Sequence, residues 1–223
     1  MVRQAYNSIV AERVVVARGM QERGVTTRAA LLEAAFECLV ELGYGATSTT
    51  EVARRAGVSR GAQLHHFPTK AELLSAAVDS LFERRNAEFR KTFANFDPGV
   101  DQIDEAIDLL WSMFQGPTFV AWAELWMAAR TDPELADKVV KIGDRFDRQS
   151  LDTFIELTSS EEGSDPDFLR LSLGFMYSLM SGMAMDILVP HQLLASPEEL
   201  IDALKLIART FSPGPAPIQE VSP

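Results

Sequence analysis

The hydrophobic positions along this chain recur at the spacing of an α-helix. Residues 31–42, 103–114, 135–146 and 200–211 each place large apolar side chains three or four positions apart, which is the pattern of a helix that buries one face. No stretch alternates strictly between apolar and polar residues between two turn signals, so we predict no β-strand. The pattern therefore predicts an all-α protein with about nine helices.

Residues that start or stop helices mark the limits of these elements. Thr27 is expected to cap the first helix and Gly43 to end it. The turn sequence Phe-Asp-Pro-Gly at 96–99 and the polar, acidic loop at 159–166 separate later helices. The proline-rich stretch 213–223 is expected to be a disordered tail.

Residues 44–70, YGATSTTEVARRAGVSRGAQLHHFPTK, predict a helix-turn-helix. Ser48 or Thr49 caps a first short helix, and Gly57 supplies the left-handed backbone that a tight turn requires. Ser59 then caps a second short helix, which a proline ends. Small alanines on both helices allow the close approach that this motif needs.

The second short helix carries side chains that can read bases or phosphates. Arg60 can reach a guanine or a phosphate, Gln63 can pair with adenine, and the histidines at 65–66 can donate to phosphate or base acceptors. A buried or merely solvent-facing Gln63 is the open alternative. Leu64 and Phe67 are expected to reach the core of a three-helix domain.

Charge is divided unevenly between the two ends of the chain. The net charge is −11, but residues 1–70 hold nine Lys and Arg against six Glu, whereas the remainder holds 12 basic and 26 acidic residues. A basic end on an acidic body allows only that end to approach phosphates. Random variation in composition explains an excess of three basic residues over residues 1–70 equally well. The arm at 1–24 carries four arginines and is expected to be a frayed helix or a flexible arm. Two alternatives stay open for its role: it lies along a groove or the phosphates of DNA, or it is an extension that makes no contacts.

The segment around this motif closely resembles the N-terminal part of TetR-type transcriptional repressors. The resemblance covers about residues 26–76, and its features are specific together although each alone is weak. They are Gly43-Tyr44 after the first helix, the turn Ala56-Gly57-Val58-Ser59, and then Gly61, His66-Phe67 and Lys70.

This resemblance implies roles in DNA binding for particular residues. A threonine matching Thr49 caps the first helix of the motif and contacts phosphate. A lysine matching Lys70 binds phosphate at a helix N-terminus, and residues matching those at 60–62 approach the major groove. The full set expected to contact DNA is Arg28, Thr47, Thr49, Ser59, Arg60, Gly61, Ala62, Gln63, His65, His66 and Lys70.

One pair of residues differs from the family. Gln63-Leu64 stand where the family commonly has an apolar residue followed by tyrosine. The phosphate contact that the tyrosine hydroxyl usually makes is therefore expected to be missing.

The resemblance also implies an order of domains. The arm at 1–24 precedes a DNA-binding domain at 25–70, and a larger domain for effector binding and dimerisation follows at 71–212, before the tail. Aromatic and methionine side chains are dense in that larger domain and suit a pocket for varied apolar ligands, although core packing explains any one of them as well. The candidates for ligand binding are Trp111, Phe114, Trp122, Trp126, Phe146, Met176, Tyr177, Met180 and Met183.

The expected partners are double-stranded DNA, a small-molecule effector and a second copy of the chain. The dimer contact is expected on the last two helices, at about 166–189 and 197–211. There, close approach is favoured by Gly174, Ser178, Ser181, Gly182 and Ala184. A homodimer places two reading helices about 34–36 Å apart, one turn of DNA, and so reads a palindromic operator.

The sequence thus predicts a sequence-specific DNA-binding regulator, a repressor that a small apolar effector releases from a palindromic operator. A helical protein-interaction module without DNA binding, or a helical enzyme, is the alternative. Motifs for a nucleophile elbow, a phosphate-binding loop, a dinucleotide site or a zinc protease do not occur, so we expect no enzyme, no metal and no cofactor. With one cysteine, Cys38, no secretory signal and no apolar stretch of about 18 residues, we expect a cytoplasmic protein without a disulfide or a membrane span.

Overall fold

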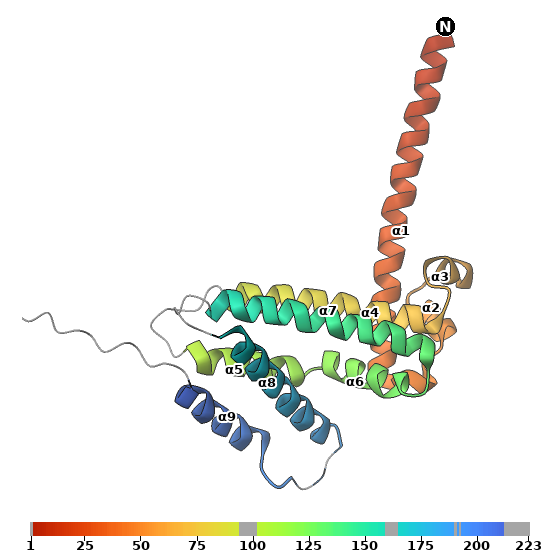
Figure 1. Cartoon of the computed structure of the whole chain (residues 1–223). Coiled ribbons are helices and arrows are strands. Elements are labelled where there is room, and N and C mark those ends of the chain that lie inside the picture. Colours follow the sequence, from red (N-terminus) through yellow and green to blue (C-terminus); the bar gives the residue numbers. More distant parts are fainter. Residues whose placement is uncertain (1, 94–101, 159–164, 190, 192, 212–223) are drawn as a thin grey trace, which may run out of the picture. The chain divides into compact units, whose positions relative to one another are not determined.

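The computed structural model of the chain is helical throughout the part that it describes, residues 2–93, 102–158, 165–189, 191 and 193–211 (Figure 1). The helices are α1 Val2–Ala46, α2 Thr49–Arg55, α3 Arg60–His66, α4 Lys70–Phe93, α5 Gln102–Phe114, α6 Pro117–Ala129, α7 Pro133–Thr158, α8 Pro166–Asp186 and α9 Pro197–Phe211. They confirm the predicted all-α fold of about nine helices. None of these described helices is both long enough and apolar enough to cross a membrane.

The predicted turn at 96–99, most of the loop at 159–166 and the tail at 213–223 lie outside the described residues. The prediction for the first helix is wrong at its start. α1 begins at Val2, so Thr27 lies inside the helix and caps nothing. Glycines at 19 and 24 weaken a helix without ending it. The helical backbone does break at Gly43, with φ 72° and ψ 170°.

The two short helices of the motif begin at serine caps. The Ser48 hydroxyl accepts the N–H of Glu51 at 3.1 Å, and the Ser59 hydroxyl accepts the N–H of Ala62 at 3.2 Å. Both serines have extended backbones, which lets the side chain turn back to the helix. Ser48 rather than Thr49 is therefore the cap of α2. Gly57 between the helices has φ 66°, as the turn requires.

The described residues belong to two compact units. The first unit takes residues from 1–83 and 120–147, and the second takes residues from 84–119 and 148–223. α4 and α7 each contribute to both units. The boundary predicted at residue 70 falls inside the first unit, and the assignment of functions to the predicted domain ranges stays a prediction.

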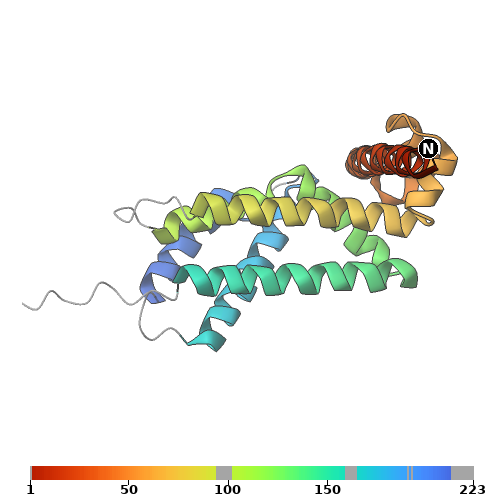
Figure 2. The same ribbon diagram turned by 90° about the horizontal axis from the view of Figure 1, so that it is seen from above.

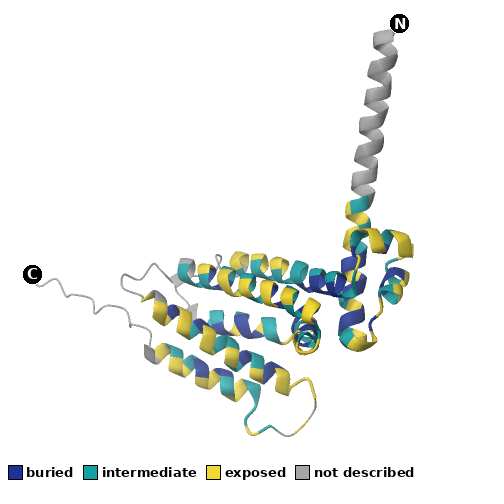
Figure 3. Ribbon diagram, turned by 45° about the vertical axis from the view of Figure 1, so that its right-hand side comes forward, coloured by how far each residue is buried: buried dark blue, intermediate teal, exposed yellow. Residues whose placement is uncertain are grey.

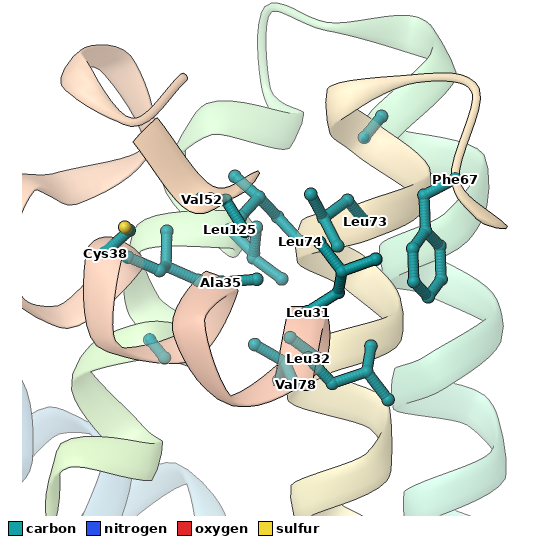
Figure 4. Packing of buried hydrophobic residues seen from close by; sticks show 14 of the residues in the cluster. Leu31, Leu32, Ala35, Cys38, Val52, Phe67, Leu73, Leu74, Val78 and Leu125 are labelled. Atoms are coloured by element: carbon teal, nitrogen blue, oxygen red, sulfur yellow. The ribbon is translucent and has the colours of Figure 1, made fainter. Parts of the chain in front are cut away.

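One apolar core holds the first unit together. Leu31 and Leu32 of α1 point towards Leu74 and Val78 of α4, and Phe67 closes the end of α3 against them (Figure 4). Further members of the core come from α2, α6 and α7, namely Val52, Ala121, Leu125, Leu135 and Val139. The helix-turn-helix thus shares its core with α4, α6 and α7.

α4 and α7 lie side by side in the first unit (Figures 1 and 2). The rings of Phe82 and Phe146 are 4.8 Å apart between centroids. The Arg145 guanidinium pairs with Asp79 and, at 3.2 Å, with Glu83. Because these charged groups are partly exposed, the apolar contact is the stronger stabilising interaction.

In the second unit, α5 packs against α8 and α9. Lys205 of α9 pairs with Asp108 of α5 at 2.7 Å. Figure 3 shows exposed stretches along both α8 and α9. Of the small residues predicted to allow close helix approach on α8, Gly174, Ser178 and Gly182 are exposed and Ser181 is half-buried, whereas Ala184 is buried within the unit and cannot lie on an outer surface.

Gly43 offers a direct test of how α1 ends. Its backbone lies in a region that only glycine adopts readily, and a Cβ there would lie 2.8 Å from Glu124 Oε2. We expect Gly43→Ala to lower the free energy of unfolding by about 1–3 kcal/mol, measured by urea denaturation at fixed protein concentration. Gly45→Ala is the matched control, because a Cβ at Gly45 meets nothing within 4 Å. Equal stability of the two variants would contradict the strained backbone at Gly43.

Candidate nucleic-acid interface

α3 presents a mostly polar face. Ser59, Arg60, Gly61 and His65 are exposed, and Ala62 and His66 are half-buried. The turn before α3 is fixed by the N–H of Val58, which donates to the carbonyl of Ala53 at 3.0 Å. A rigid turn with an exposed second helix is the arrangement that inserts side chains into a DNA groove.

Arg28 lies near the end of α3, as an interface residue would. Its guanidinium lies 5.4 Å from the ring centroid of Phe67, within the range of a cation–π contact. Its side chain is exposed. Arg28 and Arg60 therefore both offer an exposed guanidinium in the first unit.

Two of the predicted contact residues lie inside the protein, so a direct role in DNA contact is wrong for both. The Thr47 hydroxyl is buried and donates to the carbonyls of Cys38 and Gly43, at 3.0 and 2.7 Å. It stabilises the end of α1.

Gln63 is fully buried, with 0% of its surface exposed. Its Nε2 donates to the Phe67 carbonyl at 2.7 Å, and its Oε1 has no hydrogen-bond partner among the described residues. The side chain closes the C-terminal turn of α3, so it cannot read a base. Leu64, which we expected in the core, is 44% exposed instead.

The Lys70 side chain binds the C-terminal end of α1. Its Nζ donates to the carbonyls of Tyr44 and Gly45, the latter at 3.3 Å, and lies 4.3 Å from the Tyr44 ring centroid. Burial lowers the pKa of Lys70, and the charge of Asp132 opposes that effect. These carbonyls lack helical partners, so the ammonium satisfies them. Its predicted phosphate contact, like that of the half-buried Thr49, stays a prediction.

Sequence reasoning did not single out the arginines of α2. Arg54 donates to Glu51 at 2.7 and 2.8 Å, and Arg55 joins Glu51 to Glu41 of α1 at 3.0 and 2.6 Å. The hydrogen bonds from Arg54 and Arg55 lower the pKa of Glu51 to about 2. Arg55 thus ties α2 to α1, while the Arg54 side chain is 70% exposed.

Tyr44 joins the end of α1 to α6 and α7 within the first unit. Its N–H donates to Glu124 Oε2 at 2.8 Å, and its hydroxyl donates to Asp132 Oδ2 at 3.0 Å. The other oxygen of Asp132 accepts the N–H of Leu135 at 3.1 Å and so caps α7. Burial, followed by the hydrogen bond to Asp132, raises the pKa of Tyr44 to about 12. The structure therefore fixes the helix-turn-helix on the α6–α7 corner through polar contacts as well as apolar ones.

The residues predicted to bind a ligand are divided between the two units. In the second unit, Trp111, Met180 and Met183 are buried, whereas Met176 and Tyr177 are half-buried. The half-buried Phe114 packs against Phe119 and Tyr177, each 5.7 Å away between ring centroids.

In the first unit, Trp122 packs against Phe82 at 5.1 Å and Trp126 at 5.4 Å between ring centroids, and Phe146 also packs against Phe82. Trp126 is 53% exposed. Within the described residues, no three His, Cys, Asp or Glu side chains gather in a way that could hold a metal ion. Ligand binding by any of the nine candidates stays a prediction.

Comparison by sequence identifies one domain. A model for bacterial regulatory proteins of the tetR family matches residues 31–77, which run from α1 through both short helices into α4. No curated protein matches the chain by sequence.

Solved structures share the fold over most of the chain. A transcriptional regulator from Rhodococcus sp. Rha1 is 25% identical with a TM-score of 0.62, over 82% of this chain and 94% of that chain. A Saccharomonospora viridis protein in complex with choline is 18% identical with a TM-score of 0.59, over 82% and 94%. The multidrug binding protein EbrR, complexed with imidazole, is 19% identical with a TM-score of 0.56, over 85% and 97%. With the family match, these structures confirm the resemblance seen around residues 26–76.

The titration of Tyr44 tests its contact with Asp132. A folded pKa of about 12, raised first by burial and then by the hydrogen bond to Asp132, against about 10 in the unfolded chain means that the neutral Tyr44 side chain stabilises the fold below pH 10. That stabilisation is lost as the pH rises from about 10 to about 12. The difference in phenolate absorbance between the wild type and Tyr44→Phe is expected to show a midpoint near 12, and Tyr177→Phe is the control. A Tyr44 midpoint near 10 in the folded protein would contradict the buried, hydrogen-bonded position of its hydroxyl.

Proposed function

We propose that this chain, whose residues 31–77 are a helix-turn-helix domain of the tetR family of bacterial regulatory proteins, represses transcription from a palindromic operator. α3 is the reading helix, and two copies of the chain bind one operator. A small apolar effector favours a conformation with lower affinity for DNA.

The observation that carries this proposal is the exposed face of α3. Arg60 and His65 are exposed on it, and both donate hydrogen bonds to bases or phosphates. Ser59 and the Gly57 turn hold this helix in a fixed position. The basic excess of residues 1–70 on an otherwise acidic chain favours approach of this end to DNA.

An apolar stripe on α8 supports the homodimer. Phe168, Leu171, Phe175 and Met185 are exposed and lie at helical spacing, with Ser178 and Gly182 between them. An exposed stripe of this kind marks a protein–protein contact. On α9, Ile207 is a further exposed apolar residue.

Two observations support a small effector. The fold neighbours that hold choline and imidazole bind small organic molecules, and aromatic side chains meet at Phe114 and Tyr177 of the second unit. Mass spectrometry of the protein purified under native conditions identifies any retained ligand. We further propose that the protein acts in the cytoplasm, where its DNA target lies, and that it has no catalytic activity.

DNA binding is tested by the loss of the Arg60 guanidinium. We expect Arg60→Ala to weaken binding to an operator by about 1–3 kcal/mol, because one contact to a base or phosphate disappears. The operator is the DNA upstream of the gene, or a duplex selected from a random library, and binding is measured by fluorescence anisotropy at several salt concentrations.

Lys141→Ala on α7 removes an exposed positive charge outside the helix-turn-helix and is expected to leave binding unchanged. Circular dichroism checks that both variants are folded. Failure of the wild type to bind any duplex in a salt-sensitive manner would contradict the proposed function.

The dimer is tested on the α8 stripe. We expect Leu171→Glu or Phe175→Glu to convert a dimer to a monomer in sedimentation equilibrium, because a buried carboxylate at the contact lacks a partner. Val140→Glu introduces the same charge at an exposed apolar position of α7 and should leave the mass unchanged. A wild-type protein that sediments as a monomer at all concentrations would refute the homodimer.

A further inference from the structure

α3 exposes one large apolar side chain. Leu64 is 44% exposed, and the other exposed positions of this helix are Arg60, Gly61 and His65. A single exposed leucine is ordinary on a protein surface. Leu64 is unusual in its place, because the core position beside it is taken by a polar residue, Gln63.

The neighbourhood of Leu64 leaves its side chain open to a ligand. Gly61 precedes it by one helical turn, and helical side chains lean back over the preceding turn. Among the described residues, a Cβ at Gly61 would meet only the Ser59 hydroxyl within 4 Å, at 3.9 Å, so the described part of the chain leaves this position open. Gly61 and Leu64 together form a small exposed apolar surface on α3.

The polar residues on either side, Arg60 and His65, indicate what this apolar surface contacts. Arg60 and His65 carry donors for phosphates and base edges, and both are exposed on the same short helix. Leu64 has no donor or acceptor, so it cannot read a phosphate, an amino group or a carbonyl oxygen. In the major groove, the apolar group on base edges is the C5-methyl of a pyrimidine, which thymine carries in ordinary DNA.

We propose that Leu64 determines part of the operator sequence by packing on the C5-methyl group of a thymine in each half-site. This inference rests on the proposed function, in which α3 enters the major groove, and it names one base that the helix selects. Arg60 and His65 supply binding to polar groups around that methyl.

Uracil substitution tests the contact directly, because uracil is thymine without the C5-methyl group. An operator is selected from a random duplex library, and each of its thymines is replaced in turn by uracil. At one position in each half-site, uracil is expected to weaken wild-type binding about fourfold, the effect of one lost apolar carbon. Leu64→Ala should bind the thymine and uracil operators equally, and Leu64→Met should keep the preference for thymine.

Leu42→Ala is the matched control, since Leu42 of α1 is a leucine of similar exposure, 40%, outside the recognition helix. It should keep the full preference for thymine. A second selection from a library with every cytosine methylated at C5 separates the two sources of the methyl group. Retention of thymine at the sensitive position supports the proposal, and its replacement by 5-methylcytosine overturns the assignment to thymine.

Two further results would overturn the inference while leaving the proposed function intact. One is an operator that binds tightly but tolerates uracil at every position. The other is a uracil effect that persists undiminished in Leu64→Ala, since the methyl group would then act through DNA shape. If no duplex binds at all, the proposed function and this inference fall together.

Discussion

The helix-turn-helix region of this protein depends on an apolar core that it cannot complete by itself. A domain of about 45 residues buries too little apolar surface for ready stability alone. Here Leu31 and Val52 of the helix-turn-helix region are covered by Leu74 of α4 and Leu125 of α6. The position of α3 is therefore set by the next helix, α4, together with α6, which comes much later in the chain.

Polar contacts at the edge of this core give it a defined orientation. Apolar packing is non-directional, whereas the Tyr44 contacts to Glu124 and Asp132 have fixed geometry. Thr69 adds a third contact, donating to Glu134 of α7 at 2.8 Å. A displacement of the α6–α7 corner would pull on both ends of the helix-turn-helix region, through Tyr44 before it and Thr69 after it.

Local signals in the sequence predicted the helices, the Ser59 cap and the Gly57 turn, because each depends on neighbouring residues only. Leu64 was predicted in the core and is exposed, whereas for Gln63 the alternative of a buried side chain holds, and base reading does not. Their preferences for water suggest a buried leucine, but the helical phase of α3 turns position 63 inward, where the Gln63 amide bonds to the Phe67 carbonyl. The contacts of Tyr44 could not be predicted, because 80 and 88 positions separate it from its partners. The division of the ligand candidates between two units likewise depends on tertiary packing.

Because the core of the first unit takes residues from α4, α6 and α7, the helix-turn-helix does not form a core from the residues before position 70 alone. Recombination near residue 70 would bring a new helix-turn-helix against an old α6 and α7, whose Leu125, Leu135 and Val139 are shaped for the original partner. If α3 reads the operator as proposed, a change of DNA specificity is easiest by point substitution on its exposed face. Those side chains can change while the buried ones, and the helices that complete their core, stay as they are.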